Sequence, residues 1–270
     1  MICLTLPENW TLFPTSPTAW ILLILAAAIV GFSKTGVAGV GILNPVLFAM
    51  IFADNAAKSV GLLLPMLIMA DIFAVGHYRK DAKWNIIFKS LPWVFGGILA
   101  AYLFMRWFSG DMESYNSMMK LSVGIIVLAM MGLSFWLKRH QSDSEDILSS
   151  LPIWITPFFG IFTGIATMLA NAAGPIYSIF LLTFLLPKKE FMGTRALAFF
   201  IINWVKVPLQ ADLGNITAET LTLNACLFPA IGIGAIIGVK TLKVIPEKTF
   251  RMAIQVLVVL SCAKLILSAI

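Results

Sequence analysis

The stretch Gly31-Phe-Ser-Lys-Thr-Gly-Val-Ala-Gly-Val-Gly41, followed by Asn44-Pro45, decides how this chain can fold, because it places glycines and a lysine between two apolar runs. Glycine lets the backbone leave the helical conformation, and a helix that breaks inside hydrocarbon exposes amide groups that need partners. Lys34 adds a charge that costs about 3 kcal/mol at the centre of a membrane-spanning helix. The stretch therefore predicts a broken helix whose tip faces a ligand.

The composition around this stretch is that of an integral membrane protein. The 270 residues are 60% hydrophobic and 12% charged, and their mean hydropathy is +0.94. Soluble domains are far more polar. Apolar runs near helix-spanning length recur along the whole chain without a gap the size of a soluble domain, so we predict one all-α membrane domain over residues 1–270.

Ten apolar segments form two halves of about five segments each. The segments are 18–33, 37–53, 56–76, 85–107, 117–137, 151–170, 173–187, 191–210, 220–242 and 250–269. Residues 31–45 match residues 160–175, and residues 92–97 match residues 229–234. We therefore predict a first repeat at about 18–137, a linker at 138–150 and a second repeat at about 151–270. The alternative is a chance resemblance among apolar helices.

Loop charges give the orientation, because Lys and Arg gather on the cytoplasmic side of a membrane. Basic clusters occur at 79–83, 138–139, 188–195 and 240–251, and the alternate loops at 8, 111–113 and 212–219 carry acidic residues. This alternation predicts that both termini are periplasmic. It also places equivalent loops of the two halves on opposite sides, so the repeats are inverted, a plan that recurs in secondary transporters.

The first two segments of each half are short. At about 1.5 Å per residue, residues 18–52 reach roughly 52 Å and residues 151–186 roughly 54 Å, whereas two crossings of the hydrocarbon core need about 60 Å. Each pair is therefore predicted to form a re-entrant hairpin, one dipping from outside and the other from inside. Non-helical backbone is tolerated at that depth only under protein or beside a cavity, so the tips are expected to meet near the midplane.

The two tips are candidate anion sites, because a helix that starts after a break points its free amide groups and positive dipole end at the break. The residues predicted to bind substrate are Lys34, Thr35, Gly36, Gly39, Gly41, Asn44, Asn171, Gly174, Asn203 and Lys206. Three alternatives remain open. Lys34 can extend to the membrane interface, the glycines can serve close helix packing, as Gly232, Gly234 and Gly238 do in this interpretation, and Asn171 can cap the helix that follows it.

Asp71 and Lys206 occupy nearly equivalent places in the two halves. The predicted topology sets Asp71 toward the inside and Lys206 toward the outside, as symmetry mates and not as an ion pair. Asp71 is a candidate carrier of a coupling proton or a neutralising partner of Lys34; the alternative is that both charges lie among the headgroups. Thr194 and Arg195 are interpreted as a cytoplasmic anchor of their segment.

Several classes of function are excluded by what the sequence lacks. It contains no arrangement of residues typical of a nucleophilic or acid–base enzyme, and its three cysteines have no metal-ligand spacing. We therefore predict no enzyme, no cofactor and no metal. The net charge of +6 follows membrane sidedness, so no nucleic acid partner is predicted.

The chain resembles the TauE/SafE family of sulfite and sulfonate exporters, also called the toluene sulfonate uptake permease family. The resemblance runs from about Trp20 to Leu267 and rests on three short motifs. These are Lys34-Thr-Gly36-Val-Ala-Gly39-Val-Gly41 with Pro45, Leu169-Ala-Asn171-Ala-Ala-Gly174-Pro175, and Gly193-Thr194-Arg195 followed by Asn203-x-x-Lys206. Relatives often carry histidine where Asn171 stands, so a titratable role is not expected at this position.

The resemblance implies a secondary transporter of the bacterial inner membrane that moves small organic or sulfur-containing anions such as sulfite, sulfoacetate or other sulfonates. We expect it to act as an exporter by alternating access, with the anion held at the midplane. The rival interpretations are an anion channel and a non-transporting subunit of a membrane assembly. Proton coupling and a homo-oligomer are both compatible with the sequence.

Overall fold

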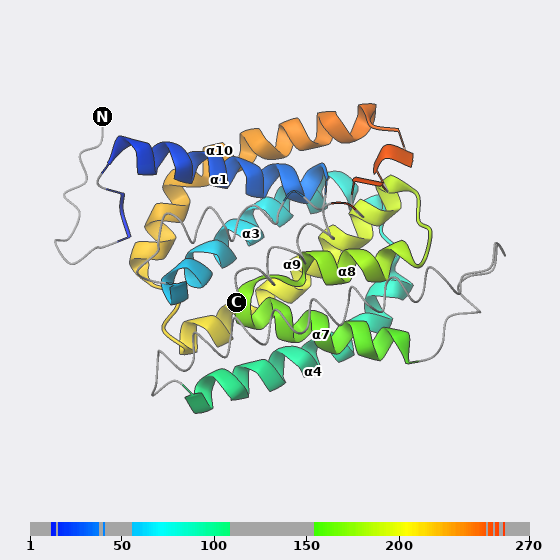
Figure 1. Cartoon of the computed structure of the whole chain (residues 1–270), viewed down its shortest axis with the longest axis horizontal. Helices are drawn as coiled ribbons and strands as arrows, with labels where there is room; N and C mark the ends of the chain where they lie inside the picture. Colours follow the sequence, from blue (N-terminus) through cyan, green and yellow to red (C-terminus); the bar gives the residue numbers. More distant parts are fainter. Residues whose placement is uncertain are drawn as a thin grey trace.

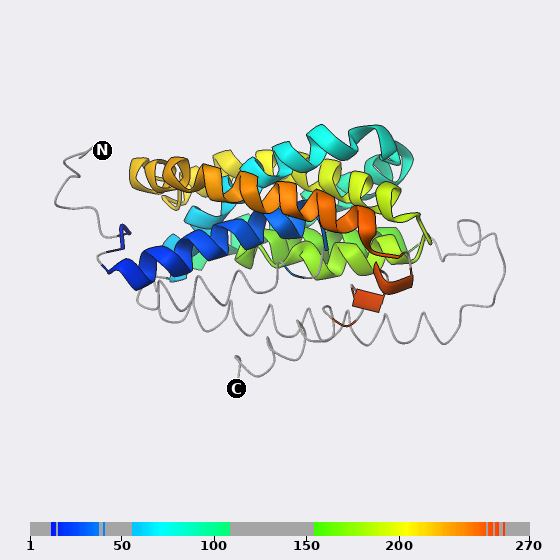
Figure 2. The ribbon, with the colours of Figure 1, turned by 90° about the horizontal axis from the view of Figure 1, so that it is seen from above.

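The computed structural model describes residues 12–14, 16–37, 40, 56–108, 154–246, 248–250, 252, 253 and 256. In this part of the chain the elements are all helical. They are α1 (Pro17–Thr35), α3 (Ala56–Tyr78), the short 3₁₀ helix η2 (Arg79–Asp81), α4 (Trp84–Phe108), α7 (Ile155–Ala170), α8 (Ala173–Leu182), α9 (Lys188–Asp212) and α10 (Ala218–Val244). The helices share one long direction and form a bundle (Figures 1 and 2).

The prediction of an all-α membrane protein is confirmed for the described residues. Four helices are long and apolar enough to cross a membrane, at Pro17–Thr35, Gly61–Asp81, Trp84–Trp107 and Ala218–Val244. The protein is therefore a multi-pass membrane protein. The segments predicted at 37–53 and 117–137, and most of the segment at 250–269, lie outside the described residues.

The first predicted break is present at the end of α1. Ser16 caps the start of this helix by accepting a hydrogen bond from the Ala19 amide at 3.2 Å, and Pro17 suits its first turn. The helix stops at Thr35, and Gly36 is its C-terminal cap. The break therefore falls inside the glycine-rich stretch that predicted it.

The second break separates α7 from α8. Asn171 ends α7 in the left-handed conformation with φ of 52°, a conformation that asparagine tolerates better than most residues. Helix α8 begins at Ala173, and Pro175 lies in its first turn, where its missing amide hydrogen costs nothing. Asn171 and Ala172 thus turn the chain back between the two helices.

Helices α7 and α8 are too short to cross a bilayer singly. They have 16 and 10 residues, which correspond to about 24 Å and 15 Å against a hydrocarbon core of about 30 Å. In Figure 1 this hairpin enters from the end of the bundle where α10 finishes, whereas α1 enters from the end where α10 begins. The two broken elements therefore point into the bundle from opposite ends.

Glycines bring two helix pairs into backbone contact. A Cβ atom on Gly31 or Gly234 would lie 2.0 Å or 1.9 Å from a carbonyl oxygen across the contact between α1 and α10. At Gly97 and Gly164, between α4 and α7, the corresponding distance is 2.1 Å in both cases. Helices α1 and α10 run in one direction in Figure 1, and α4 and α7 run in the other. The same type of packing thus occurs twice, in pairs of opposite direction.

The loops at the two ends of the bundle differ in their charges. At one end the Lys83 ammonium pairs with the Glu190 carboxylate at 2.9 Å, and Lys188 donates to the carbonyl oxygens of Leu242, in the last turn of α10, and Ile245, just after it. At the other end Asp212 accepts a hydrogen bond from the Tyr102 hydroxyl at 2.6 Å. The basic loops 79–83 and 188–190 therefore lie together, away from the acidic loop that follows α9.

Candidate functional site

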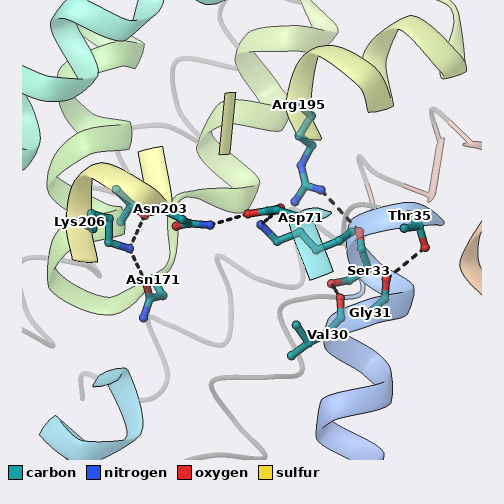
Figure 3. Close-up of polar contacts among 11 residues, drawn as sticks. Val30, Gly31, Ser33, Thr35, Asp71, Asn171, Arg195, Asn203 and Lys206 are labelled. Atoms are coloured by element: carbon teal, nitrogen blue, oxygen red, sulfur yellow. Dashed lines mark hydrogen bonds and ion pairs between the residues drawn. The ribbon is translucent and has the colours of Figure 1, made fainter. Parts of the chain in front are cut away.

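A row of buried polar side chains crosses the centre of the bundle (Figure 3). The Lys34 ammonium nitrogen lies 2.6 Å from Oδ1 of Asp71, and the Asn203 side-chain amide donates to Oδ2 of Asp71 at 2.7 Å. The exposed fractions of these side chains are 6% for Lys34, 0% for Asp71 and 1% for Asn203. The alternative in which Lys34 extends to the membrane interface is therefore wrong.

Lys34 reaches this row from the last turn of α1. The negative end of the helix dipole stabilises a cation at that position. The ammonium also lies 4.8 Å from the ring centre of Phe199, and the Arg195 guanidinium lies 5.3 Å from the same ring centre. One aromatic ring of α9 thus contacts two cations, an arrangement that cation–π attraction stabilises.

Arg195 joins the two broken elements. Its Nη1 donates to the carbonyl of Ser33 near the end of α1 at 3.5 Å, and a Cβ atom on Gly174 would lie 3.3 Å from its Nη2. The side chain is 5% exposed. The interpretation of Thr194 and Arg195 as a cytoplasmic anchor is therefore wrong. Thr194 is also buried, and its hydroxyl accepts a hydrogen bond from the Lys83 amide.

The inward position of Arg195 could have been predicted from its spacing in the sequence. It lies four residues before Phe199, which lies four residues before Asn203, so these residues share one face of a helix. Gly193 allows this face to turn inward, because a Cβ atom there would lie 2.5 Å from the Tyr78 carbonyl oxygen in the corner between α3 and η2. The close packing of α9 on this corner buries the first turns of the helix.

Lys206 lies at the second tip. Its ammonium nitrogen donates to the Thr167 hydroxyl at 3.0 Å and to Oδ1 of Asn171. The residue before α8, Ala172, makes no side-chain cap. Asn171 ends α7 with its backbone and binds Lys206 with its side chain.

Asp71 and Lys206 are both fully buried, so the alternative that sets their charges among the headgroups is wrong. Among the described contacts Asp71 pairs with Lys34, and Lys206 binds only neutral groups. The expectation that Asp71 and Lys206 do not form an ion pair therefore agrees with the described contacts. Of the two roles predicted for Asp71, the contact matches neutralisation of Lys34.

Two predicted substrate ligands face helix α10 instead of the row. The Thr35 hydroxyl lies 2.7 Å from the Ala235 carbonyl oxygen. The Gly36 amide donates to the Phe32 carbonyl oxygen at 2.8 Å, and a Cβ atom on Gly36 would lie 2.8 Å from Cα of Gly238. In this structure both residues lie in the contact of α1 with α10. For Gly36 this matches the alternative in which the glycines serve close helix packing. Gly39, Gly41 and Asn44 lie outside the described residues.

Basic side chains outnumber acidic ones in the described part of the site. The buried row holds three basic side chains, Lys34, Arg195 and Lys206, and Asp71 is its acidic member among the described residues. Buried basic N–H donors form charge-assisted hydrogen bonds to an anion. The described residues contain no cluster of three His, Cys, Asp or Glu side chains that could hold a metal ion. The donors present therefore suit an anion.

The same residues carry the motifs of a known family. The family model described as "Sulfite exporter TauE/SafE" matches residues 21–265 of the chain. The chain belongs to the TauE/SafE family. Comparison with curated proteins and with solved structures gives no match. Membership in the TauE/SafE family identifies the chain as a membrane transporter of anions of the sulfite exporter type, which agrees with the prediction that it is not an enzyme.

Proposed function

We propose that this TauE/SafE protein is a secondary transporter, acting as an exporter, of small organic or sulfur-containing anions such as sulfite, sulfoacetate and other sulfonates. The observation that carries the proposal is the cluster of buried basic side chains beside two broken helices. Lys34, Arg195 and Lys206 lie in one buried row with Asp71, and basic N–H donors of this kind form charge-assisted hydrogen bonds to an anion.

The anion is proposed to lie between the two tips. Arg195 contacts the end of α1 and the start of α8. The first amide groups of α8 have no acceptor within their own helix, and the dipole of α8 is positive at that end. Lys34 on α1, Arg195 on α9 and the amides of Ala173 and Gly174 on α8 are thus the proposed donors to one ligand.

We infer that the transport cycle is alternating access between two inverted repeats, at about 18–137 and 151–270, joined by the linker 138–150. The paired glycine contacts of α1 with α10 and of α4 with α7 support this proposal, since they recur in helix pairs of opposite direction. Rocking of one half against the other would expose the tips to each side in turn. Proton coupling is part of the proposal.

The proposed location is the bacterial inner membrane, with the basic end of the bundle in the cytoplasm and both termini in the periplasm. The clustering of Lys83 and Lys188 at one end and Asp212 at the other supports this orientation, because positive loops stay on the cytoplasmic side.

The test is counterflow in liposomes that contain the purified protein. A trapped anion should exchange for the same labelled anion outside, with saturation, and the panel is sulfite, sulfoacetate, isethionate, sulfate and lactate. Because Lys34 and Arg195 donate to the anion, the Lys34→Ala and Arg195→Gln variants should lose about tenfold or more of the exchange rate. Arg195→Gln leaves the pair of Lys34 and Asp71 intact. Lys89, exposed on α4, supplies the matched control Lys89→Ala.

The outcomes separate the rival functions. A channel would conduct the anion without exchange, and a subunit of a membrane assembly would show neither exchange nor conduction. Wild-type exchange rates in both Lys34→Ala and Arg195→Gln would show that the buried row does not bind the anion.

A further inference from the structure

We propose that Lys206 carries a coupling proton, so that one proton moves with each transported anion. This inference rests on the proposed anion transport and adds the identity of the coupling residue. It departs from the sequence-based prediction, which gave Asp71 as the candidate.

The hydrogen bonds of Lys206 fit an uncharged amine. An amine has two N–H groups and a lone pair, whereas an ammonium has three N–H groups that all need acceptors. Lys206 makes two hydrogen bonds, to the Thr167 hydroxyl and to the Asn171 amide oxygen. These two acceptors satisfy both N–H groups of the amine. The lone pair then remains available to take up a proton.

A charged form of Lys206 also has a place in the structure. Oδ1 of Asn203 is buried and has no hydrogen-bond donor among the described residues. Asn203 lies three residues before Lys206 on α9, so the two side chains are neighbours on one helix face. The direction of the Asn203 amide follows from its contact with Asp71, because only the nitrogen end can donate to a carboxylate. This oxygen or the bound anion is the proposed acceptor for the third N–H group of an ammonium.

The charged and titratable groups around Lys206 are already engaged elsewhere. Asp71 on α3 pairs with Lys34 on α1, and the Tyr177 hydroxyl on α8 is hydrogen-bonded to Ser90 on α4 at 3.1 Å. On α9 itself, Arg195 contacts Ser33. No described carboxylate is thus left to pair with Lys206, and a buried ammonium without a counter-charge is unfavourable. An anion at the site supplies that counter-charge.

These contacts give a proton cycle that balances. When an anion enters, the Lys206 lone pair takes a proton from water on the same side and forms the N–H bond of an ammonium. When the anion leaves on the other side, the N–H bond breaks and the proton returns to water. Asp71 does not suit this role, because its two carboxylate oxygens stay bound to Lys34 and Asn203.

The experiment measures anion accumulation that is driven by a pH gradient at zero membrane potential. Liposomes that contain the protein are clamped with potassium and valinomycin. The probe is whichever of isethionate and sulfate gives the larger counterflow. Both anions stay ionised near neutral pH, so a proton that moves with them belongs to the protein. In the wild type, a gradient of one pH unit should hold about a tenfold anion gradient, which is the equilibrium value for one proton per anion.

Two variants test the assignment to Lys206. Lys206→Met, which carries no proton, and Lys206→Arg, which keeps its charge, should each lose accumulation driven by the pH gradient by a larger factor than they lose counterflow. Counterflow needs no net proton movement, so it separates loss of coupling from loss of binding. Lys89→Ala should accumulate anion as the wild type does.

Several results would overturn the inference while the proposed function stands. One is wild-type counterflow without accumulation driven by pH; another is accumulation that persists in Lys206→Met. Loss of counterflow in both folded variants would make Lys206 an essential anion ligand instead. If neither variant folds, the wild type alone tests the inference. Isethionate added to unbuffered, detergent-solubilised wild-type protein should then cause proton uptake, and no proton uptake would refute the inference. Exchange confined to sulfite or lactate, which carry their own protons, would also refute it. Absence of counterflow with every anion would refute the proposed function itself.

Discussion

At the scale of single residues, the pair of Lys34 and Asp71 sets the electrostatics of the site. The two charged atoms are 2.6 Å apart and almost fully buried. A buried ion pair contributes little net stability, because the loss of hydration opposes the attraction. Removing one partner of the pair is costly, however, because the remaining charge is buried and not hydrated. The pair therefore positions Lys34 and keeps its charge inside the protein.

Removal of one partner should show this asymmetry. We expect Asp71→Ala to lower the free energy of unfolding by about 3–5 kcal/mol, because it leaves Lys34 buried without its counter-charge. Combining Lys34→Met with Asp71→Leu should restore most of that loss, since the pair is replaced by apolar groups of similar size. Thermal unfolding in detergent measures both. Equal stability of Asp71→Ala and wild type would contradict a matched buried pair.

At the scale of helices, the close contacts of α1 with α10 and of α4 with α7 depend on glycine. Without a strong hydrophobic force between helices in lipid, association depends on close backbone packing. Gly97 and Gly164 allow it between α4 and α7. Because α7 leads directly to Asn171 and thus to Lys206, this contact holds one tip in place.

Two neighbouring glycines of α4 give a matched test of this packing. A Cβ atom on Gly97 would lie 2.1 Å from the Ile161 carbonyl oxygen, whereas one on Gly96 would meet nothing within 4 Å. We expect Gly97→Ala to destabilise the protein by about 1–3 kcal/mol, the usual cost of overpacking. Gly96→Ala should be neutral or more stable by up to about 1 kcal/mol, because alanine favours the helix. Thermal unfolding of the two variants checks the difference; equal effects would mean that α4 and α7 separate easily.

At the scale of the whole molecule, different polar contacts join the helices at the two ends of the bundle. Lys83 and Glu190 join α9 to the corner after η2 at the basic end. At the opposite end the Glu219 carboxylate, at the start of α10, accepts a hydrogen bond from the amide of Leu12, before α1. If the halves rock as proposed, the contacts at one end must break when the site opens to that side. Each set of contacts therefore lies where a transport gate is expected.

The orientation of these ends can be measured by labelling single cysteines. We expect cysteines placed at Ala82 and Ala218, in a background without Cys3, Cys226 and Cys262, to react with a membrane-impermeant maleimide from opposite faces of the membrane. The cytoplasmic face should expose position 82, because its loop is basic. Labelling of both positions from one face would contradict the orientation and the inverted halves.

In the described part of the chain, the sequence by itself determined which segments are helices and where two of them break. The predicted runs 18–33, 85–107 and 220–242 match α1, α4 and α10 within two residues at each end, since hydropathy, glycine and proline act locally along the chain. Gly36 and Asn171 mark the breaks for the same reason.

Only the tertiary structure decided which side chains meet. Arg195, expected at the membrane surface, lies at the centre, and Thr35, expected to bind substrate, packs on α10. Lys34 pairs with Asp71, which settles one of the two roles that the sequence had left open for Asp71. The physical reason is that a helix end can turn a side chain toward any neighbour. Which neighbour it meets depends on packing between distant segments, such as Gly193 against Tyr78 and Gly36 against Gly238, and not on local composition.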